Sequence, residues 1–335
     1  MRIGIITQPL KANYGGVIQN WALQQVLKKL GHNPITIDYQ HSEGILYWAK
    51  INIIRFVKSI FTPSIRYEYL HRKAKRPYIF ESFVDKHINT TEIVYKYTPS
   101  LINKYKLDCI IIGSDQVWRP IYNHECLFDM YGQFVTHNNC KLLSYAASFG
   151  TNEWEYSEEQ TIKCAQLIKR FCSISVRERG GVKLCKENFA KDATQVLDPT
   201  LLLTKEDYLS LVNDTPPQIE KPFLVAYILD FTNEIENLIY KKAEDLGLYP
   251  FIVRAGESSK LTPLQWISLF RDADYIITDS FHGSIFSLIF EKQFESLGNS
   301  SRGNSRFDLI KELIREQNIP ELRNLSLKWL KSKLQ

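Results

Sequence analysis

The sequence predicts an α/β protein made of two Rossmann-like halves that face each other across a cleft. Short apolar runs alternate with segments of helical period, which is typical of parallel strands joined by helices. A polar stretch with two prolines, at 213–221, interrupts this alternation, which then restarts. The length of 335 residues suits two domains of about 150 residues each.

The first half is expected to begin with a strand at 2–7 and an amphipathic helix at 17–30, which ends before Gly31 as a C-cap. A second strand follows at 35–38. The later strands are short, apolar and followed by polar or glycine-bearing turns, as buried parallel strands are. They are expected at 108–113, 142–146, 173–177 and 195–197.

A domain boundary is predicted near 205–221, because prolines without apolar periodicity are typical of a linker. We expect an N-terminal domain at 1–205, a linker at 206–220 and a C-terminal domain at 221–335. Two Rossmann-like domains joined in this way form a GT-B-like arrangement. The second half should alternate strands at 223–229, 250–254, 275–278 and 294–297 with helices at 234–246, 263–272 and 284–290.

Composition excludes several classes of protein. With 44% hydrophobic and 24% charged residues, the chain is neither disordered nor collagen-like. The 6 cysteines include no Cys-x-x-Cys pair, so we interpret them as reduced core thiols and not as zinc ligands or disulfides. No apolar run reaches about 18 residues and the N-terminus does not resemble a signal peptide, which predicts a cytoplasmic protein.

The net charge of +5 is unevenly distributed along the chain. Residues 1–100 contain 14 Lys and Arg against 6 Asp and Glu, whereas the remainder holds 28 against 31. The total is too small to indicate nucleic acid, and we expect no nucleic-acid partner. A local positive excess suits an anionic substrate or a membrane surface.

A basic, aromatic-rich insertion at about 44–87 distinguishes the first half. Its first part, 44–61, is apolar but carries Lys50, Arg55 and Lys58. A helix that packs on the first domain is the ordinary interpretation of such a stripe. The alternative is a helix lying in a membrane interface, which would place the protein at the inner face of the membrane.

The turn at 8–16 is the first candidate for ligand binding. Open α/β sheets bind ligands where strands end and helix N-termini offer unpaired N–H groups. Gly15 and Gly16 would let the backbone approach a ligand closely, and Asn13 and Gln19 offer hydrogen bonds to hydroxyl groups. A purely structural turn is the alternative.

Further polar turns follow the later strands of the first half. Asp115 is able to act as a base on a hydroxyl group or to cap the next helix, and Trp118 to stack on a sugar ring. Arg177 suits a bidentate hold on a carboxylate or phosphate, or else a salt bridge to Glu178. We interpret Asp198 as a turn or cap residue.

The second half has one polar loop of special interest. Of 7 histidines, only His282 lies at the tip of a predicted strand, beside a helix N-terminus that favours an anion. Downstream, Arg302 and Arg306 flank a glycine and would cradle a small, multiply charged anion. A solvated surface loop is the alternative for the two arginines.

Six motifs follow one another along almost the whole chain. They are N-Y-G-G-V-I-Q-N-W-A-L (13–23), I-I-G-S-D-Q-V-W (111–118), S-Y-A-A-S-F-G (144–150), I-S-V-R-E (174–178), L-D-P-T (197–200) and T-D-S-F-H-G (278–283). In this order they resemble the polysaccharide pyruvyl transferase family. The resemblance implies a GT-B-like fold and transfer of the enolpyruvyl unit of phosphoenolpyruvate onto a sugar of a capsule or exopolysaccharide, ending as a cyclic pyruvate ketal.

The implied mechanism assigns roles to the candidate residues. His282 is the expected general acid or phosphate-stabilising group, and Asp115 activates or orients a sugar hydroxyl. Some relatives carry Arg-Leu-His-Gly where this chain has 280–283, so we expect Arg302 or Arg306 to replace that arginine. The predicted donor site comprises Arg177, Ser280, His282, Gly283, Arg302 and Arg306. The predicted acceptor site comprises Asn13, Tyr14, Gly15, Gly16, Gln19 and Trp118.

No metal and no cofactor are expected beyond phosphoenolpyruvate as co-substrate, because no histidine cluster has the spacing of metal ligands. The implied acceptor is a sugar, free or on a lipid-linked oligosaccharide. Two other functions fit the same cleft. One is a GT-B glycosyltransferase that uses a nucleotide-sugar donor, and the other is a non-catalytic module that binds phosphosugars.

Overall fold

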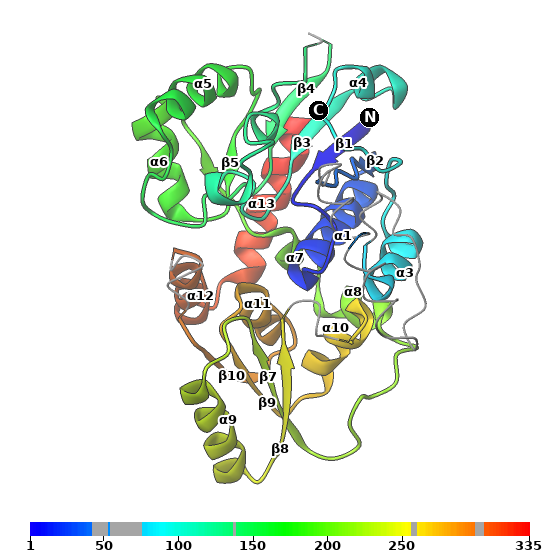
Figure 1. Cartoon of the computed structure of the whole chain (residues 1–335), viewed down its shortest axis with the longest axis vertical. Helices are drawn as coiled ribbons and strands as arrows, with labels where there is room; N and C mark the ends of the chain where they lie inside the picture. The colour runs from blue at the N-terminus through cyan, green and yellow to red at the C-terminus, as the bar shows by residue number, and fades with distance from the viewer. Residues whose placement is uncertain (42–52, 54–75, 137–138, 256–259, 299–304) are drawn as a thin grey trace.

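The computed structural model describes residues 1–41, 53, 76–136, 139–255, 260–298 and 305–335. In this part of the chain, parallel β-sheets with helices packed around them form two halves, one above the other in Figure 1. The predicted α/β class with two Rossmann-like halves is confirmed.

The first sheet is parallel and has the strand order β2-β1-β3-β4. Every residue of β3 is buried, as expected for a strand covered on both faces. The short pair β5-β6 continues the sheet through bridges at Leu143–Ser173 and Ala147–Val176. The strands are β1 (Arg2–Ile6), β2 (Asn33–Thr36), β3 (Cys109–Ile112), β4 (Lys141–Ser144), β5 (Ser175–Val176) and β6 (Thr194–Gln195).

The helices of the first half surround this sheet. Most of α1 is buried, because it packs against α7 and against α10 of the second half. The helices are α1 (Tyr14–Lys29), α3 (Tyr78–His87), α4 (Ser100–Lys104), α5 (Glu158–Ile168), α6 (Arg179–Phe189), α7 (Pro199–Leu202) and α8 (Lys205–Leu211), with 3₁₀ turns at Pro120–Tyr122 and Asp129–Tyr131.

The second sheet is also parallel, with the order β10-β9-β7-β8. Counted from the first strand of each half, both sheets have the order second, first, third, fourth. The strands are β7 (Phe223–Ile228), β8 (Tyr249–Arg254), β9 (Tyr275–Thr278) and β10 (Gln293–Ser296). The helices are α9 (Asn233–Leu246), α10 (Pro263–Asp272), α11 (Phe281–Ile289), α12 (Ser305–Glu316) and α13 (Ile319–Leu334).

The two halves share one hydrophobic core. Tyr14 of α1 stacks on Trp266 of α10 with 5.3 Å between the ring centroids. The Tyr14 hydroxyl also donates a hydrogen bond of 2.6 Å to the Leu261 carbonyl. Apolar packing therefore joins the halves at α1 and α10.

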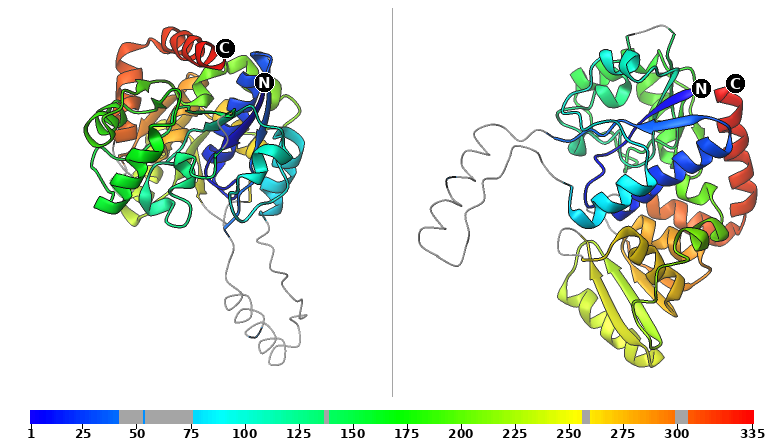
Figure 2. Two further views of the ribbon diagram at one scale, coloured as in Figure 1. Left: turned by 90° about the horizontal axis from the view of Figure 1, so that it is seen from above. Right: turned by 90° about the vertical axis from the view of Figure 1, so that its right-hand side faces the viewer.

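The last helix, α13, returns from the second half to the first (Figures 1 and 2). Ser326 accepts a hydrogen bond of 3.0 Å from the Leu197 amide, and Arg323 donates one to the Leu201 carbonyl. The C-terminus consequently lies near the N-terminus in all three views. The predicted C-terminal segment 221–335 thus ends on the first half, and the division at 206–220 stays a prediction.

All the strands expected from the sequence are present, with bounds within two residues of the expected ones. Two helices begin three residues earlier than expected, α1 at Tyr14 and α11 at Phe281. In both, a polar N-cap lies directly before a segment with glycine, and we expected the glycine to belong to the turn. This difference matters because it places His282 within the first turn of α11.

The predicted insertion at 44–87 lies mostly outside the described residues, and so do both interpretations of 44–61. Its last part forms α3, which buries Phe80, Phe83 and Val84. In the described ranges, the helices are too short or too polar to cross a membrane.

Candidate active site

A cavity of about 430 Å³ lies between the two halves. In each sheet the second strand lies on one side of the first strand, and the third and fourth strands lie on the other side. In open α/β sheets, this switch in strand order leaves a crevice at the carboxyl ends of the first and third strands, where ligands bind. The loops after β1 and β3 line the cavity from one side, and those after β7, β8 and β9 from the other. Its main polar groups belong to Gln8, Asn13, Asp115, Gln116, Ser280 and His282.

Asn13 and Asp115 present their side chains from the first half. Asn13 caps α1, because its Oδ1 accepts a hydrogen bond of 3.2 Å from the Gly16 amide. Its Nδ2 lies 3.4 Å from Asp115 Oδ2. The two side chains are thus neighbours in the cavity wall, and the Gly16 amide is used within the protein.

Asp115 has a strained backbone. Its φ of 77° lies in the left-handed region, which costs a residue with a side chain on the order of 1–3 kcal/mol and is often found at functional sites. The Gln116 amide donates to its Oδ1 at 2.9 Å, and its carbonyl accepts from the Ser148 amide at 3.1 Å. Asp115 caps no helix, since the following 3₁₀ turn begins after Arg119. The cap interpretation is therefore wrong.

His282 enters the cavity from the second half. Ser280 caps α11 by accepting a hydrogen bond of 3.3 Å from the Gly283 amide. A Cβ on Gly283 would overlap the Thr278 hydroxyl, so glycine lets α11 begin directly against β9. His282 is the second residue of this helix and only 6% exposed, which leaves little freedom for its ring.

The N-termini of α1 and α11 meet at His282. A Cβ on Gly15 would overlap the imidazole near Nδ1, so the face of the ring packs directly on the backbone of α1. Helix N-termini carry partial positive charge and unpaired N–H groups. Two of them at one cavity favour an anionic ligand.

Behind His282 lies a buried network of charges. Asp198, the N-cap of α7, accepts hydrogen bonds through Oδ2 from Ser114 at 2.9 Å and from Arg177 at 3.0 Å. Arg177 also donates to Glu178 at 2.7 Å and lies over the Phe281 ring. The same Oδ2 lies 3.8 Å from Nε2 of His282.

These contacts keep Asp198 and Arg177 ionised. Burial opposes the charge of Asp198, but His282, Arg177 and the Thr200 amide outweigh it and hold the pKa of this carboxyl well below its usual range. Burial likewise lowers the pKa of Arg177, but Glu178 and Asp198 outweigh it and raise the pKa above its usual value. The network is therefore a set of paired charges within the protein.

Residues 13–301 match the family described as polysaccharide pyruvyl transferase, which is most of the chain and most of the cavity wall. This chain belongs to that family. The resemblance of the six motifs is thereby confirmed, and so is polysaccharide pyruvyl transfer as the general activity of the family. No curated protein matches the chain.

Solved structures similar to this pyruvyl transferase family member include two UDP-N-acetylglucosamine 2-epimerases. The epimerase from Rickettsia bellii has 12% identity and a TM-score of 0.45, with 99% of this chain and 95% of that chain covered. The one from Neisseria meningitidis has 10% identity and a TM-score of 0.48, with 100% and 99% covered. A glycosyltransferase from Rickettsia africae has 14% identity and a TM-score of 0.40, with 99% and 92% covered.

Three predicted acceptor residues of this pyruvyl transferase family member belong to its core. Trp118 is fully buried, stacks on Tyr131 with 5.0 Å between centroids and donates to the Met130 carbonyl. Tyr14 packs between the halves, and Gln19 donates to Thr7 and to a helix carbonyl. The sequence motifs could not show that these side chains point away from the cavity.

The six predicted donor residues differ in position. Ser280 and His282 line the cavity, and Gly283, the next residue of α11, packs against Thr278. Arg177 is fully buried behind the cavity and pairs with Glu178, as one of its two interpretations expected, and its hold on the donor stays a prediction. Arg302 and the side chain of Arg306 lie outside the described part of the chain.

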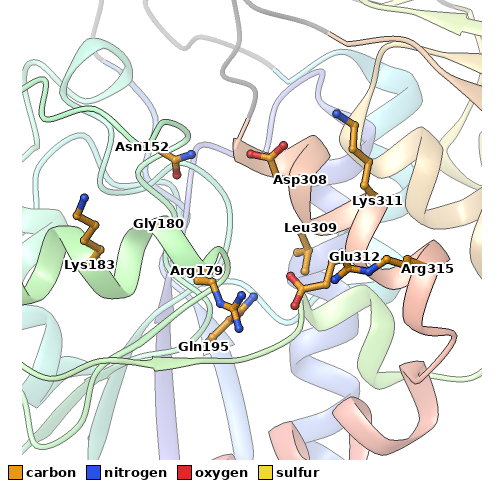
Figure 3. Close-up of a pocket in the computed structure, with 10 residues that line it drawn as sticks. All are labelled: Asn152, Arg179, Gly180, Lys183, Gln195, Asp308, Leu309, Lys311, Glu312 and Arg315. Atoms are coloured by element: carbon orange, nitrogen blue, oxygen red, sulfur yellow. The ribbon is translucent and has the colours of Figure 1, made fainter.

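A second cavity, of about 570 Å³, lies between α6 and α12 (Figure 3). Arg179 and Lys183 project from α6 on one side, and Asp308 and Glu312 from α12 on the other. Arg315, also on α12, pairs with Glu316 at 3.0 Å. This surface carries both charges and is exposed, unlike the buried network around His282.

Sequence reasoning missed Asp198 as a part of the site. A capping aspartate looks the same in sequence whether its second oxygen faces solvent or a histidine. Gln8 and Tyr227 were also missed, although each lies at or just after the end of a strand. Across the described ranges, no three His, Cys, Asp or Glu side chains gather as metal ligands would.

Proposed function

We propose that this protein transfers the enolpyruvyl group of phosphoenolpyruvate onto a sugar of a polysaccharide repeat unit. The product is a cyclic pyruvate ketal, and phosphate is released. The observation that supports this most is that Asp115 from the first half and His282 from the second line the same cavity. An acid and a base on opposite walls suit a reaction that moves protons between donor and acceptor.

The donor side of the cavity is the N-terminus of α11. Phosphoenolpyruvate carries a carboxylate and a phosphate, which helix N–H groups and an imidazolium stabilise. His282 would protonate the methylene carbon, which leaves an oxocarbenium-like centre at the neighbouring carbon. Ser280 uses its hydroxyl to cap the helix, so its contribution to binding is to hold the N–H groups in place.

The acceptor side consists of Asp115 and Asn13. Asp115 Oδ2 would take the proton of the attacking hydroxyl, and Asn13 would orient the sugar. Phosphate then leaves, and a second hydroxyl of the same sugar closes the ketal. The two sugar hydroxyl groups together lose two protons. One is equivalent to the proton that forms the new methyl C–H bond, and the other leaves with phosphate.

The acceptor is proposed to be a lipid-linked repeat unit at the inner face of the membrane. The positive excess in residues 1–100 supports this, because it attracts anionic lipid headgroups and pyrophosphate linkages. A soluble glycoside with the same sugar should then react with a higher KM than the lipid-linked form. Equal KM values would contradict the lipid part of the proposal alone.

The reaction is tested by incubating the protein with phosphoenolpyruvate and a panel of synthetic or lipid-linked glycosides. The product should gain the mass of one pyruvate less one water, and phosphate should appear only when the acceptor is present. Sugar transfer from a nucleotide-sugar donor would instead identify a glycosyltransferase. Binding of phosphosugars without any product would identify a non-catalytic module.

His282→Ala tests the acid. Turnover should fall by about 10²–10⁴-fold, which is the usual contribution of a positioned acid or base. Thermal unfolding of the variant shows whether the fold persists. Wild-type turnover in a folded His282→Ala variant would exclude His282 as the acid.

A further inference from the structure

We propose that Asp198 is a positioning residue for His282, which orients the imidazole and fixes the proton on its Nε2. This inference deepens the proposed function, because it says how the same histidine is prepared for reaction. It adds a function to a residue whose sequence indicates only a helix cap.

The two oxygens of Asp198 have separate partners. Oδ1 forms the cap, since it accepts from the Thr200 amide at 3.0 Å and the Thr200 hydroxyl at 2.7 Å. Oδ2 faces the other way, toward Ser114, Arg177 and His282. A helix cap needs only the first oxygen, so capping does not explain the second set of contacts.

His282 Nε2 needs such a partner. This nitrogen is buried and has no hydrogen-bond partner in the described part of the chain, and a buried polar atom without one is costly. The Oδ2 of Asp198, at 3.8 Å, is the carboxylate oxygen that it faces. Catalytic contacts of this length often shorten to hydrogen bonds when substrate binds. A carboxylate at this place favours a proton on Nε2.

The face of the ring is held by α1. Gly15 packs over the ring near Nδ1, so the ring is confined between the backbone of the first half and the carboxylate of Asp198. With a proton on Nε2, Nδ1 is left as the nitrogen that gains and loses the reacting proton. Among the residues that the structure describes, the other charged groups around the ring are Arg177, paired with both carboxylates, and Asp115 across the cavity.

Glu178 offers a matched control within the same network. It is a buried carboxylate that pairs with Arg177, as Asp198 does, and it also accepts a hydrogen bond from the Ser148 hydroxyl. If Asp198 serves only to neutralise Arg177, then Asp198→Asn and Glu178→Gln should have the same effects. If Asp198 acts through His282, the two variants should differ.

The closing experiment begins with nitrogen NMR of labelled histidine in the wild-type protein, with His282 assigned by its loss in His282→Gln. We expect the neutral form of the ring to carry its proton on Nε2. A neutral form with the proton on Nδ1 would overturn the inference. This measurement needs neither donor nor acceptor, so it remains decisive if the proposed reaction is wrong, and also if Asp198→Asn fails to fold.

Kinetics then test the action through His282. Asp198→Asn should lower kcat by about 10²–10⁴-fold with a small change in KM. It should also move the alkaline limb of the pH profile of kcat to lower pH, because the imidazolium of His282 loses a neighbouring carboxylate. Glu178→Gln should leave the alkaline limb of the pH profile where it is in the wild type. In a His282→Gln background, Asp198→Asn should cost no further activity. Equal pH limbs in the two carboxylate variants, or additive losses in the double variant, would overturn the inference.

Discussion

The position of the His282 ring depends on Gly15, which has no side chain. A Cβ at Gly15 would overlap the imidazole, and because it would be part of the helix it could not move aside. Gly15→Ala should therefore displace the ring and lower turnover by at least tenfold, whereas stability should change little because alanine favours helix by about 1 kcal/mol. Turnover and thermal unfolding separate the two effects.

Gly16→Ala is the comparison for this prediction. Its Cβ would meet the nearest atom, Asn13 Nδ2, at 3.2 Å, and that side chain is able to shift by the little that is needed. The loss of turnover should therefore be smaller than in Gly15→Ala. Equal losses of turnover in both variants would mean that turnover depends on the N-terminus of α1 in general and not on the contact of Gly15 with His282.

Asp129 gives the protein a pH dependence that is separate from catalysis. Burial raises the pKa of this carboxyl from 3.8 to about 6, despite the opposing charges of Lys96 and Lys163. The folded state thus binds a proton more tightly than the unfolded state. The free energy of unfolding should fall as pH rises from about 4 to about 6, since ionisation costs more in the folded protein.

Asp129→Asn removes the free-energy cost of ionising this carboxyl in the folded protein. Above pH 6 the variant should be more stable than the wild type by about 1–2 kcal/mol, after allowance for solvent screening of this half-buried group. Below pH 4 the two should be alike. Denaturant unfolding at several pH values measures the difference, and parallel pH curves for the two proteins would contradict the assignment.

At the scale of elements, the cap of α11 combines stability with ligand binding. Ser280→Ala removes the hydrogen bond to the Gly283 amide and should cost about 1 kcal/mol of stability. Ser280→Asp restores a cap but adds negative charge where the donor's phosphate is expected. Its melting temperature should approach that of the wild type while KM for phosphoenolpyruvate rises.

Ser157 is the matched control for this element. It caps α5 through a capping box with Gln160, on an exposed surface away from the cavity. Ser157→Ala should cost a similar amount of stability and leave KM unchanged. If Ser280→Asp keeps the wild-type KM, the donor does not bind at the N-terminus of α11.

At the scale of the whole molecule, the shared core predicts a single unfolding transition. Tyr14 stacks on Trp266 across the halves and also contacts Phe80, so neither half can unfold without exposing the other. Calorimetry should show one transition with equal calorimetric and van't Hoff enthalpies. Tyr14→Ala should lower stability by about 3–5 kcal/mol, as aromatic core truncations do. Two separate transitions in the wild type would contradict a shared core.

The strands could be predicted because their signal is local. Runs such as that of β3 are apolar along their whole length, since both faces of a parallel strand are buried. The start of α11 could not be placed in the same way. Ser280 and Gly283 have the composition of a turn, and only the hydrogen bond between them shows that they form a helical cap.

The sequence by itself determined the α/β class, the two halves, the family and the position of His282 and Asp115 at strand ends, because these depend on periodicity and motif order. The tertiary structure decided which polar side chains reach the cavity. Trp118 and Arg177 follow strands just as Asp115 does, yet both are buried behind the wall. The partnership of Asp198 with His282 joins residues 84 positions apart, and only folding brings those two side chains together.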